Sequence, residues 1–294
     1  MLDAPKPIVP TPQSPAPDTA MPTIAFGPHR VSRLVLGANP INAGSHLSRF
    51  VNLQMKRYFT PERVQELLRA CAAAGVNAFQ STAYNLPAVA EFRRAGGQMQ
   101  FISLAHEQPD QPDPLPALVA GGTIGIAHHG EVTDHLFKLG QLDQIRPFLA
   151  RIRATGVQVG ISTHMPAVVD YVEAQGWDVD FYMACIYERH RSREELRAQL
   201  GAVPLPAREV YLEEDPPRMF AAIRRTRRPC LAFKILAAGR LCERQDAVEA
   251  AFQETFRQIK PNDAVIVGIY PEWEDQVRLD AEYVRRFSAL SVAP

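Results

Sequence analysis

Eight short apolar runs recur along the chain and constrain its fold more than any other feature. Amphipathic stretches, with apolar residues at i, i+3 and i+4 spacing, separate most of them. The runs are LVLGAN from Leu34, NAFQST from Asn77, QFISLAH from Gln100, TIGIAHH from Thr123, VQVGIST from Val157, VDFYMAC from Val179, LAFKILA from Leu231 and AVIVGIY from Ala264. Strands that are apolar on both faces need helices over both faces of their sheet. The pattern therefore predicts an α/β fold, most simply a closed (β/α)8 TIM barrel.

An open, doubly wound sheet is the alternative fold. Such a sheet usually carries a glycine-rich G-x-G-x-x-G turn after its first strand, and GANPINAGSH from Gly37 does not fit that pattern. The closed barrel is therefore favoured. In front of the first strand, TIAFGPHRVSRLVLGAN from Thr23 predicts a β-hairpin.

Helix start and stop signals support this alternation. TPERVQELLRACAAAG begins with Thr60 as N-cap and Pro61 at the first helical position, and it stops at Gly75. We expect Asp215 to cap the helix DPPRMFAAIRRT, and Thr163 or Ser162 to cap the helix that follows VGISTHMP. The other helical stretches are LDQIRPFLARIRATG from Leu142, MPAVVDYVEAQG from Met165, ERQDAVEAAFQETFRQI from Glu243 and EWEDQVRLDAEYVRRFSAL from Glu272.

The chain divides into a proline-rich tail and one barrel domain. Residues 1–22 are rich in proline, lack a continuous apolar stretch and begin without a basic cluster. This pattern predicts a disordered tail, and neither a signal peptide nor a membrane anchor. Residues 23–294 are predicted to form a single catalytic barrel. The connection from 186 to 214 is longer than a barrel turn needs, so we expect it to form a lid or a small subdomain.

Composition excludes several classes of partner. Lysine plus arginine equals aspartate plus glutamate at 32 each, so no net field favours nucleic acid. No run of 18 apolar residues is present, so no membrane span is expected. Four widely spaced cysteines predict a reduced, cytoplasmic setting, and Cys71, Cys185 and Cys230, which lie in apolar segments, are expected in the core. The expected partner is a small molecule, and the sequence leaves the oligomeric state open.

Polar side chains gather where the predicted strands end. In a (β/α)8 barrel the carboxyl ends of the strands form the active face. Of the neighbours His128 and His129, alternation along a strand sends one inward and one outward. Lys234 lies within an apolar run, where a lysine needs water, a partner or an anion. The strand-end candidates for catalysis are Gln80, Tyr84, His106, His129 and His164.

Several segments, in order along the chain, resemble those of the aldo-keto reductase superfamily. They are RVSRLVLGAN, AGVNAFQSTA, IAHHG, VGISTH, DFYMACIYERHR, KILAAGRL and VIVGIYPEWEDQV, and the resemblance covers residues 23 to 287. Members of that family are NAD(P)-dependent (β/α)8 barrels that reduce carbonyl groups with an Asp, Tyr, Lys, His tetrad. The resemblance implies NAD or NADP as cofactor and a small hydroxylated or carbonyl, sugar-like substrate.

The resemblance assigns roles residue by residue. His129 matches the histidine of the tetrad, Tyr84 lies one residue short of the tyrosine position, Gln80 takes the aspartate position and His106 the lysine position. On the cofactor side, Ser162 matches the hydroxyl that meets the nicotinamide carboxamide, Thr163 replaces an asparagine, and Lys234 lies near the pyrophosphate position. The expected cofactor site is completed by Gly239, Gly268 and Tyr270.

Three functions remain open from the sequence. The first is an NAD(P)-dependent oxidoreductase of the aldo-keto reductase type. The second is a lyase or isomerase on the same barrel, either cofactor-independent or using a divalent metal held by His106, His129 and His164. The third is a binding protein whose catalytic set has decayed. Fold alone does not choose among them.

Overall fold

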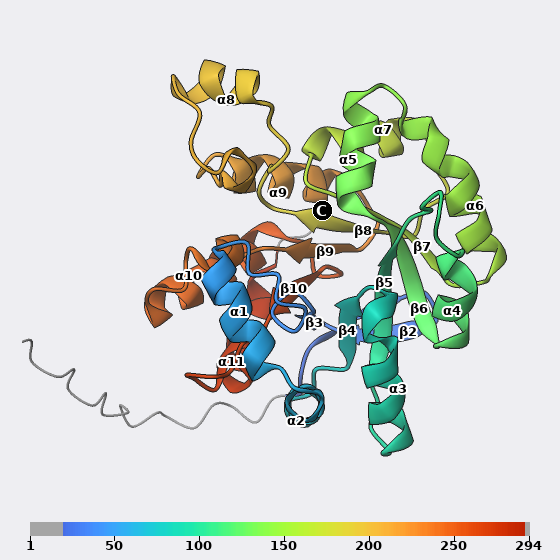
Figure 1. The fold of residues 1–294 in the computed structure, drawn as a ribbon, viewed down its shortest axis with the longest axis vertical. Helices are drawn as coiled ribbons and strands as arrows, with labels where there is room; N and C mark the ends of the chain where they lie inside the picture. The colour runs from blue at the N-terminus through green and yellow to red at the C-terminus, as the bar shows by residue number, and fades with distance from the viewer. Residues whose placement is uncertain (1–19, 292–294) are drawn as a thin grey trace, which may run out of the picture.

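The computed structural model describes residues 20–291, and within them eight parallel strands close into a barrel (Figure 1). The ring runs in the order β10, β3, β4, β5, β6, β7, β8, β9. The predicted (β/α)8 fold is confirmed, and each of the eight apolar runs contains a strand. The strands are β3 (Leu34–Gly37), β4 (Ala78–Ser81), β5 (Gln100–Ala105), β6 (Thr123–His128), β7 (Gln158–Thr163), β8 (Phe181–Cys185), β9 (Cys230–Phe233) and β10 (Ala264–Gly268). Of the predicted tail, residues 1–19 lie outside the described part.

The predicted hairpin is present and closes the amino-terminal end of the barrel. Strand β1 (Thr23–Phe26) pairs antiparallel with β2 (His29–Ser32), and Gly27 turns the chain at a φ of 56°. Phe26 packs on Phe181 inside the barrel, with their ring centroids 4.7 Å apart. An added Cβ at Gly125 would lie 2.8 Å from Phe26, so this glycine makes room for the aromatic plug.

Helices surround the barrel and bury their apolar faces against it (Figure 1). Thr60 caps α2 by accepting a hydrogen bond from the Arg63 amide, and Gly75 takes a φ of 83° beyond its end, as predicted. The helices are α1 (Arg49–Tyr58), α2 (Pro61–Ala73), α3 (Leu86–Arg94), α4 (Pro114–Ala120), α5 (Gly130–Lys138), α6 (Arg146–Ala154), α7 (Pro166–Ala174), α8 (Arg193–Leu200), α9 (Asp215–Arg225), α10 (Gln245–Gln258) and α11 (Gln276–Phe287). Short 3-10 turns are η1 (Ala83–Asn85), η2 (Leu142–Ile145), η3 (Ala207–Glu209), η4 (Ala237–Gly239) and η5 (Ser288–Leu290).

Two predicted helix caps are wrong. Asp215 is the first residue of α9, and its carboxylate accepts hydrogen bonds from Arg191 and from the Leu212 amide instead. Met165 is the N-cap residue of α7 and makes no side-chain cap; the Thr163 hydroxyl accepts from the Met165 amide at 3.0 Å, outside the helix. At Asp215, a tertiary partner occupies the carboxylate that would have capped the helix. At Thr163, the hydroxyl bonds within an irregular turn before the helix begins.

The long connection after β8 carries α8 and η3 and stands out from the rim of the barrel (Figure 1). Ser192 and Glu195 form a capping box at the start of α8. That this connection acts as a lid or a small subdomain stays a prediction. Arg189, which precedes α8 in this connection, lines the cavity described below.

Two further findings concern residues 20–291. No helix there combines the length and apolar character needed to cross a bilayer. Cys71, Cys185 and Cys230 are buried in the core, as predicted.

Candidate active site

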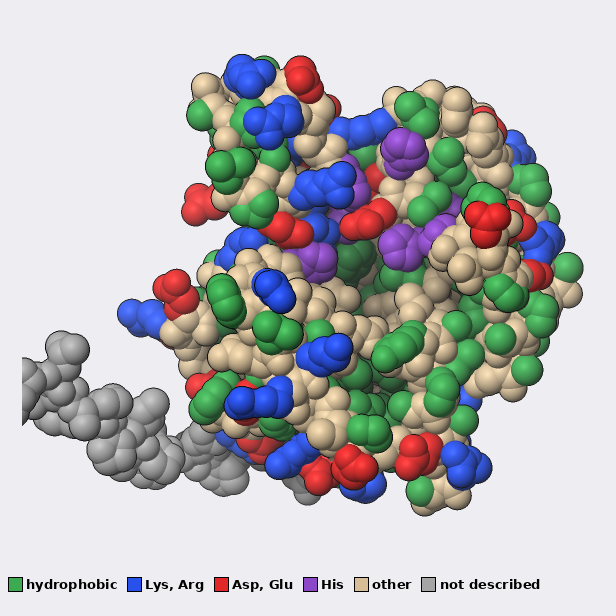
Figure 2. Space-filling model, in the orientation of Figure 1, with side chains coloured by type: hydrophobic (Ala, Val, Ile, Leu, Met, Phe, Trp, Pro, Cys, Tyr) green, Lys and Arg blue, Asp and Glu red, His purple; other side chains and the backbone are tan. Residues whose placement is uncertain are grey.

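A cavity of about 500 Å³ opens at the carboxyl ends of the strands. Figure 2 shows histidine side chains gathered around this hollow. A volume of this size suits a small organic ligand. Among the described lining residues, the cations are Arg189 and Lys234 and the acids are Glu131, Glu274 and Asp280.

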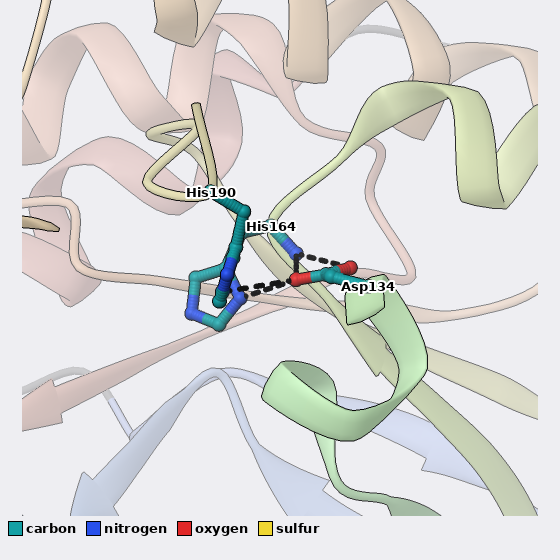
Figure 3. A group of neighbouring side chains, drawn as sticks. All are labelled: Asp134, His164 and His190. Atoms are coloured by element: carbon teal, nitrogen blue, oxygen red, sulfur yellow. Dashed lines mark hydrogen bonds and ion pairs between the residues drawn. The ribbon is translucent and has the colours of Figure 1, made fainter. Parts of the chain in front are cut away.

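An aspartate and a histidine form a buried hydrogen-bonded pair at the cavity wall (Figure 3). His164 follows β7 and lines the cavity, and its Nδ1 lies 2.7 Å from Oδ2 of Asp134 on α5. The same carboxylate accepts from the Thr163 hydroxyl and from the His164 amide at 3.0 Å. His164 Nε2 has no hydrogen-bond partner among the described residues. The pair therefore fixes the imidazole and leaves its second nitrogen for a ligand.

Burial and nearby charges set the protonation of this pair. Burial, with the charges of Arg189 and Lys234, lowers the pKa of His164 well below its usual value. Burial raises the pKa of Asp134 to about 6, although its hydrogen bonds oppose that shift. At neutral pH the imidazole is therefore neutral, which is the form that accepts a proton.

The two neighbouring histidines point in opposite directions, as predicted. His128 ends β6, is buried against Phe148, and its Nδ1 lies 2.8 Å from the Thr133 hydroxyl. His129 is the N-cap residue of α5 and lines the cavity, where its buried Nδ1 has no hydrogen-bond partner among residues 20–291. His128 is thus a packing residue, and His129 presents polar atoms to the site.

Backbone strain concentrates in the two loops beside the cavity. Within residues 20–291, the non-glycine residues with positive φ are Ala43, His46, Lys234, Ala237 and Ala238, with φ between 48° and 61°. The first two lie after β3 and the other three after β9. Such conformations cost about 1–3 kcal/mol each and often mark binding sites.

The structure brings most of the predicted site residues to one cavity. Those that line it are Gln80, His129, Ser162, His164, Lys234, Gly239, Gly268 and Tyr270. Lys234 lies just past β9, which ends at Phe233, so the expectation that it sits inside a strand is wrong. Its left-handed backbone ends the strand there.

Three predicted residues are not among the lining residues of this cavity. Tyr84 is 79% exposed. Thr163 is buried and bonds Asp134. His106 is half-buried, with its ring centroid 5.2 Å from that of His129. A proton-donating tyrosine at position 84 is thus not at hand for a ligand in this cavity.

A different trio from the predicted metal ligands comes together. Ligand atoms of Asp134, His164 and His190 lie within 4.8 Å of one another, so only His164 is shared with the predicted set of His106, His129 and His164. Two ligand atoms on one tetrahedral zinc ion lie about 3.3 Å apart. The 3.3 Å between His190 Nε2 and Asp134 Oδ2 fits that spacing, but the 2.7 Å between His164 and Asp134 is a hydrogen bond. The three residues therefore fit a hydrogen-bonded Asp134–His164 pair with His190 beside it better than they fit a metal centre.

Sequence reasoning missed Asp134, His190, Arg189 and Asp280. For Asp134 a signal existed, because it shares one helical face with the buried Gly130 and Thr133, and an acid on a buried face needs a partner. His190 and Arg189 lie in the long connection, where no periodicity gives direction. The path of that loop alone brings Arg189 to the cavity and His190 to Asp134.

Comparison with solved structures shows the same barrel at low sequence identity. A truncated 3-deoxy-D-arabino-heptulosonate 7-phosphate synthase from Thermotoga maritima is 13% identical with a TM-score of 0.52, over 92% of each chain. An aldo/keto reductase from Brucella melitensis is 12% identical with a TM-score of 0.49, over 92% of this chain and 100% of that one. The glycerol dehydrogenase from Gluconobacter oxydans is 10% identical with a TM-score of 0.48, over 92% and 97%.

The strand order defines the class of the fold, a (β/α)8 TIM barrel, and the likeness to the synthase agrees with that fold and shows no more than that. No family model and no curated protein sequence matches this chain. Membership of the aldo-keto reductase superfamily stays a prediction from the sequence.

Proposed function

We propose that this chain is a TIM-barrel enzyme that moves a proton on a small polar substrate, in a lyase or isomerase reaction. His164 acts as general base through Nε2, and Asp134 orients the imidazole through Nδ1. The observation that carries the proposal is the 2.7 Å contact between Asp134 and a histidine that lines the cavity. An imidazole held in this way is neutral, has a defined tautomer and is ready to accept a proton.

The proton step uses residues that already surround the cavity. His164 Nε2 takes a proton from a carbon or hydroxyl of the substrate and becomes an imidazolium, which the Asp134 carboxylate stabilises. The imidazolium then returns that proton to another position or to a leaving group. Gln80 and His129, which line the same cavity, are available to bond substrate oxygens.

Solvent deuterium exchange tests this proposal directly. In D2O, proton NMR follows deuterium uptake into small hydroxycarbonyl compounds and keto acids. We expect the wild-type protein to accelerate exchange in at least one class, and His164→Gln to lose about 10²-fold or more of that rate. His135→Gln is the matched control, since His135 is exposed on α5 beside Asp134. Equal rates for wild type and His164→Gln would contradict the assignment of the base.

The nicotinamide-dependent oxidoreductase is the second candidate. Ser162, predicted to meet the carboxamide, lines the cavity, and the cavity continues past β10 toward α11. That extension, however, carries the Glu274 carboxylate and no lysine or arginine among the described lining residues, a poor environment for a pyrophosphate. Fluorescence titration with NADH and NADPH separates the candidates. Binding of either below the millimolar range would favour the oxidoreductase.

A further inference from the structure

Two cationic side chains face the cavity from different loops. Arg189 comes from the connection after β8 and Lys234 from the turn after β9. The Arg189 side chain is only 6% exposed. Burial, together with the Arg189 charge, lowers the pKa of Lys234 to about 8, and both cations help to lower the pKa of His164. Like charges held this close repel one another, so an anion between them would be favoured.

Neither cation is fully satisfied by the protein. Arg189 Nη2 donates to Glu209 at 2.5 Å, but the buried Nε of Arg189 has no partner, and no bond from Nη1 is made within the described chain. Lys234 Nζ likewise has no hydrogen-bond partner there. Glu131 and Glu209 lie within electrostatic range of Lys234, yet neither is bonded to it. An ammonium and a guanidinium with open donors at a cavity wall form a cradle for an anionic group.

The backbone holds Lys234 in place at an energetic cost. Its φ is 61°, and Ala237 and Ala238 in the same turn are also left-handed. Side chains other than glycine disfavour this conformation, so the turn that ends β9 places Lys234 at a cost in backbone energy. The strain therefore accompanies a lysine that is directed to the site.

We propose that the cavity binds its substrate by an anionic group, a carboxylate or a phosphate, held between Lys234 and Arg189 next to His164. This inference rests on the proposed function and names the class of substrate for that same site. The rest of the substrate would extend toward the end of the cavity that carries Glu274 and Asp280. That end carries the Glu274 carboxylate and no lysine or arginine among the described lining residues, which disfavours a second anionic group, so the substrate carries its negative charge at one end.

Calorimetric titration with inorganic phosphate and, separately, with acetate at constant ionic strength tests the anion site. We expect saturable binding of one or both anions by the wild-type protein, and binding about tenfold weaker or more in Lys234→Met and in Arg189→Met. Arg225→Met is the control, since Arg225 makes an exposed ion pair with Asp170 and should leave binding unchanged. Preference for phosphate or for acetate assigns the anionic group. Circular dichroism checks that each variant is folded, and Lys234→Met alone suffices if Arg189→Met does not fold.

The outcomes separate this inference from the proposed function. No anion binding by the wild-type protein, or equal binding by Lys234→Met, would overturn the anion site even if deuterium exchange still depended on His164. Conversely, equal exchange rates for wild type and His164→Gln, together with anion binding that depends on Lys234, would overturn the assignment of the base and leave the anion site intact. Anion binding that needs Lys234, without any exchange activity, would support the anion site and favour a binding protein over an enzyme.

Discussion

Two buried aspartates near the cavity differ in what surrounds them. Asp134 accepts hydrogen bonds from the Thr163 hydroxyl and from two groups of His164, whereas Asp280 on α11 is bonded to nothing among the described residues. Burial raises the pKa of Asp134 to about 6 and that of Asp280 to about 8. Hydrogen bonds that favour the carboxylate account for the smaller shift at Asp134. At this scale, a few donors decide whether a buried acid is charged at neutral pH.

Asp280→Asn should become more stabilising, relative to wild type, as the pH rises from 5 to 9. The folded chain keeps the Asp280 proton up to about pH 8, while the unfolded chain loses it near 3.8. Over that range the wild-type free energy of unfolding therefore falls with rising pH, and the uncharged asparagine does not titrate. Urea denaturation at both pH values should show a relative gain of more than about 1 kcal/mol. Asp143→Asn, at an exposed position, should show no such change; a pH-independent difference for Asp280→Asn would refute the idea.

At the scale of elements, one carboxylate ties the connection after β8 to the loop after β3. Glu209, in η3, accepts hydrogen bonds from Arg189 at 2.5 Å and from His46 Nδ1 at 3.1 Å. Arg240, after β9, donates to the His46 carbonyl at 3.1 Å and packs over the Tyr211 ring at 4.1 Å. Three loops thus meet over the cavity through these contacts. Residues in such loops open locally unless contacts of this kind hold them.

Removal of the Glu209 carboxylate should loosen the connection after β8 and the loop after β3 without unfolding the barrel. In Glu209→Ala, amide hydrogen exchange measured by mass spectrometry should increase in residues 186–214 and 39–47, because Arg189 and His46 lose their shared acceptor. The strands should keep their protection. Glu194→Ala, on the exposed side of α8, is the control and should leave residues 39–47 unchanged. Unaltered exchange in both loops of Glu209→Ala would show that the contact does not hold them.

At the scale of the whole molecule, a buried ionic cluster joins the last strands to the first at the amino-terminal end of the barrel. Lys260 Nζ lies 2.9 Å from Asp263 Oδ1, and both side chains are at most 1% exposed. Asp263 also accepts from the Cys230 amide at 2.8 Å, while Arg33 donates to the carbonyls of Asp263 and Lys260. Residues more than 200 positions apart thereby close the ring.

Asp263→Ala should lower the free energy of unfolding by about 3–5 kcal/mol, because it leaves the Lys260 ammonium buried without its counter-ion. Urea denaturation at pH 7 measures the change. Glu249→Ala breaks an exposed pair with Arg286 and should cost about 1 kcal/mol or less. Similar costs for the two variants would mean that the buried pair does not stabilise the closed barrel.

The sequence by itself determined the strands, the hairpin and the barrel, because the periodicity of apolar residues is set by local geometry that the chain carries with it. It also brought His129, His164 and Lys234 to the right end of the molecule, since parallel strands of a barrel all end on one face. It did not determine which direction Tyr84 takes, because that residue lies past a strand end, where a short 3-10 turn carries it outward.

Only the tertiary structure decided the partners. Asp134 meets His164 across 30 positions of sequence, and Arg189 reaches the cavity from a loop without periodicity. Hydrogen bonds and ion pairs need the distance between two side chains to be right to within a few tenths of an ångström. Distances are fixed this closely only when the core has packed. For the same reason, Lys260 in the polar segment QIKPND gives no sign in the sequence of the buried ion pair that it makes.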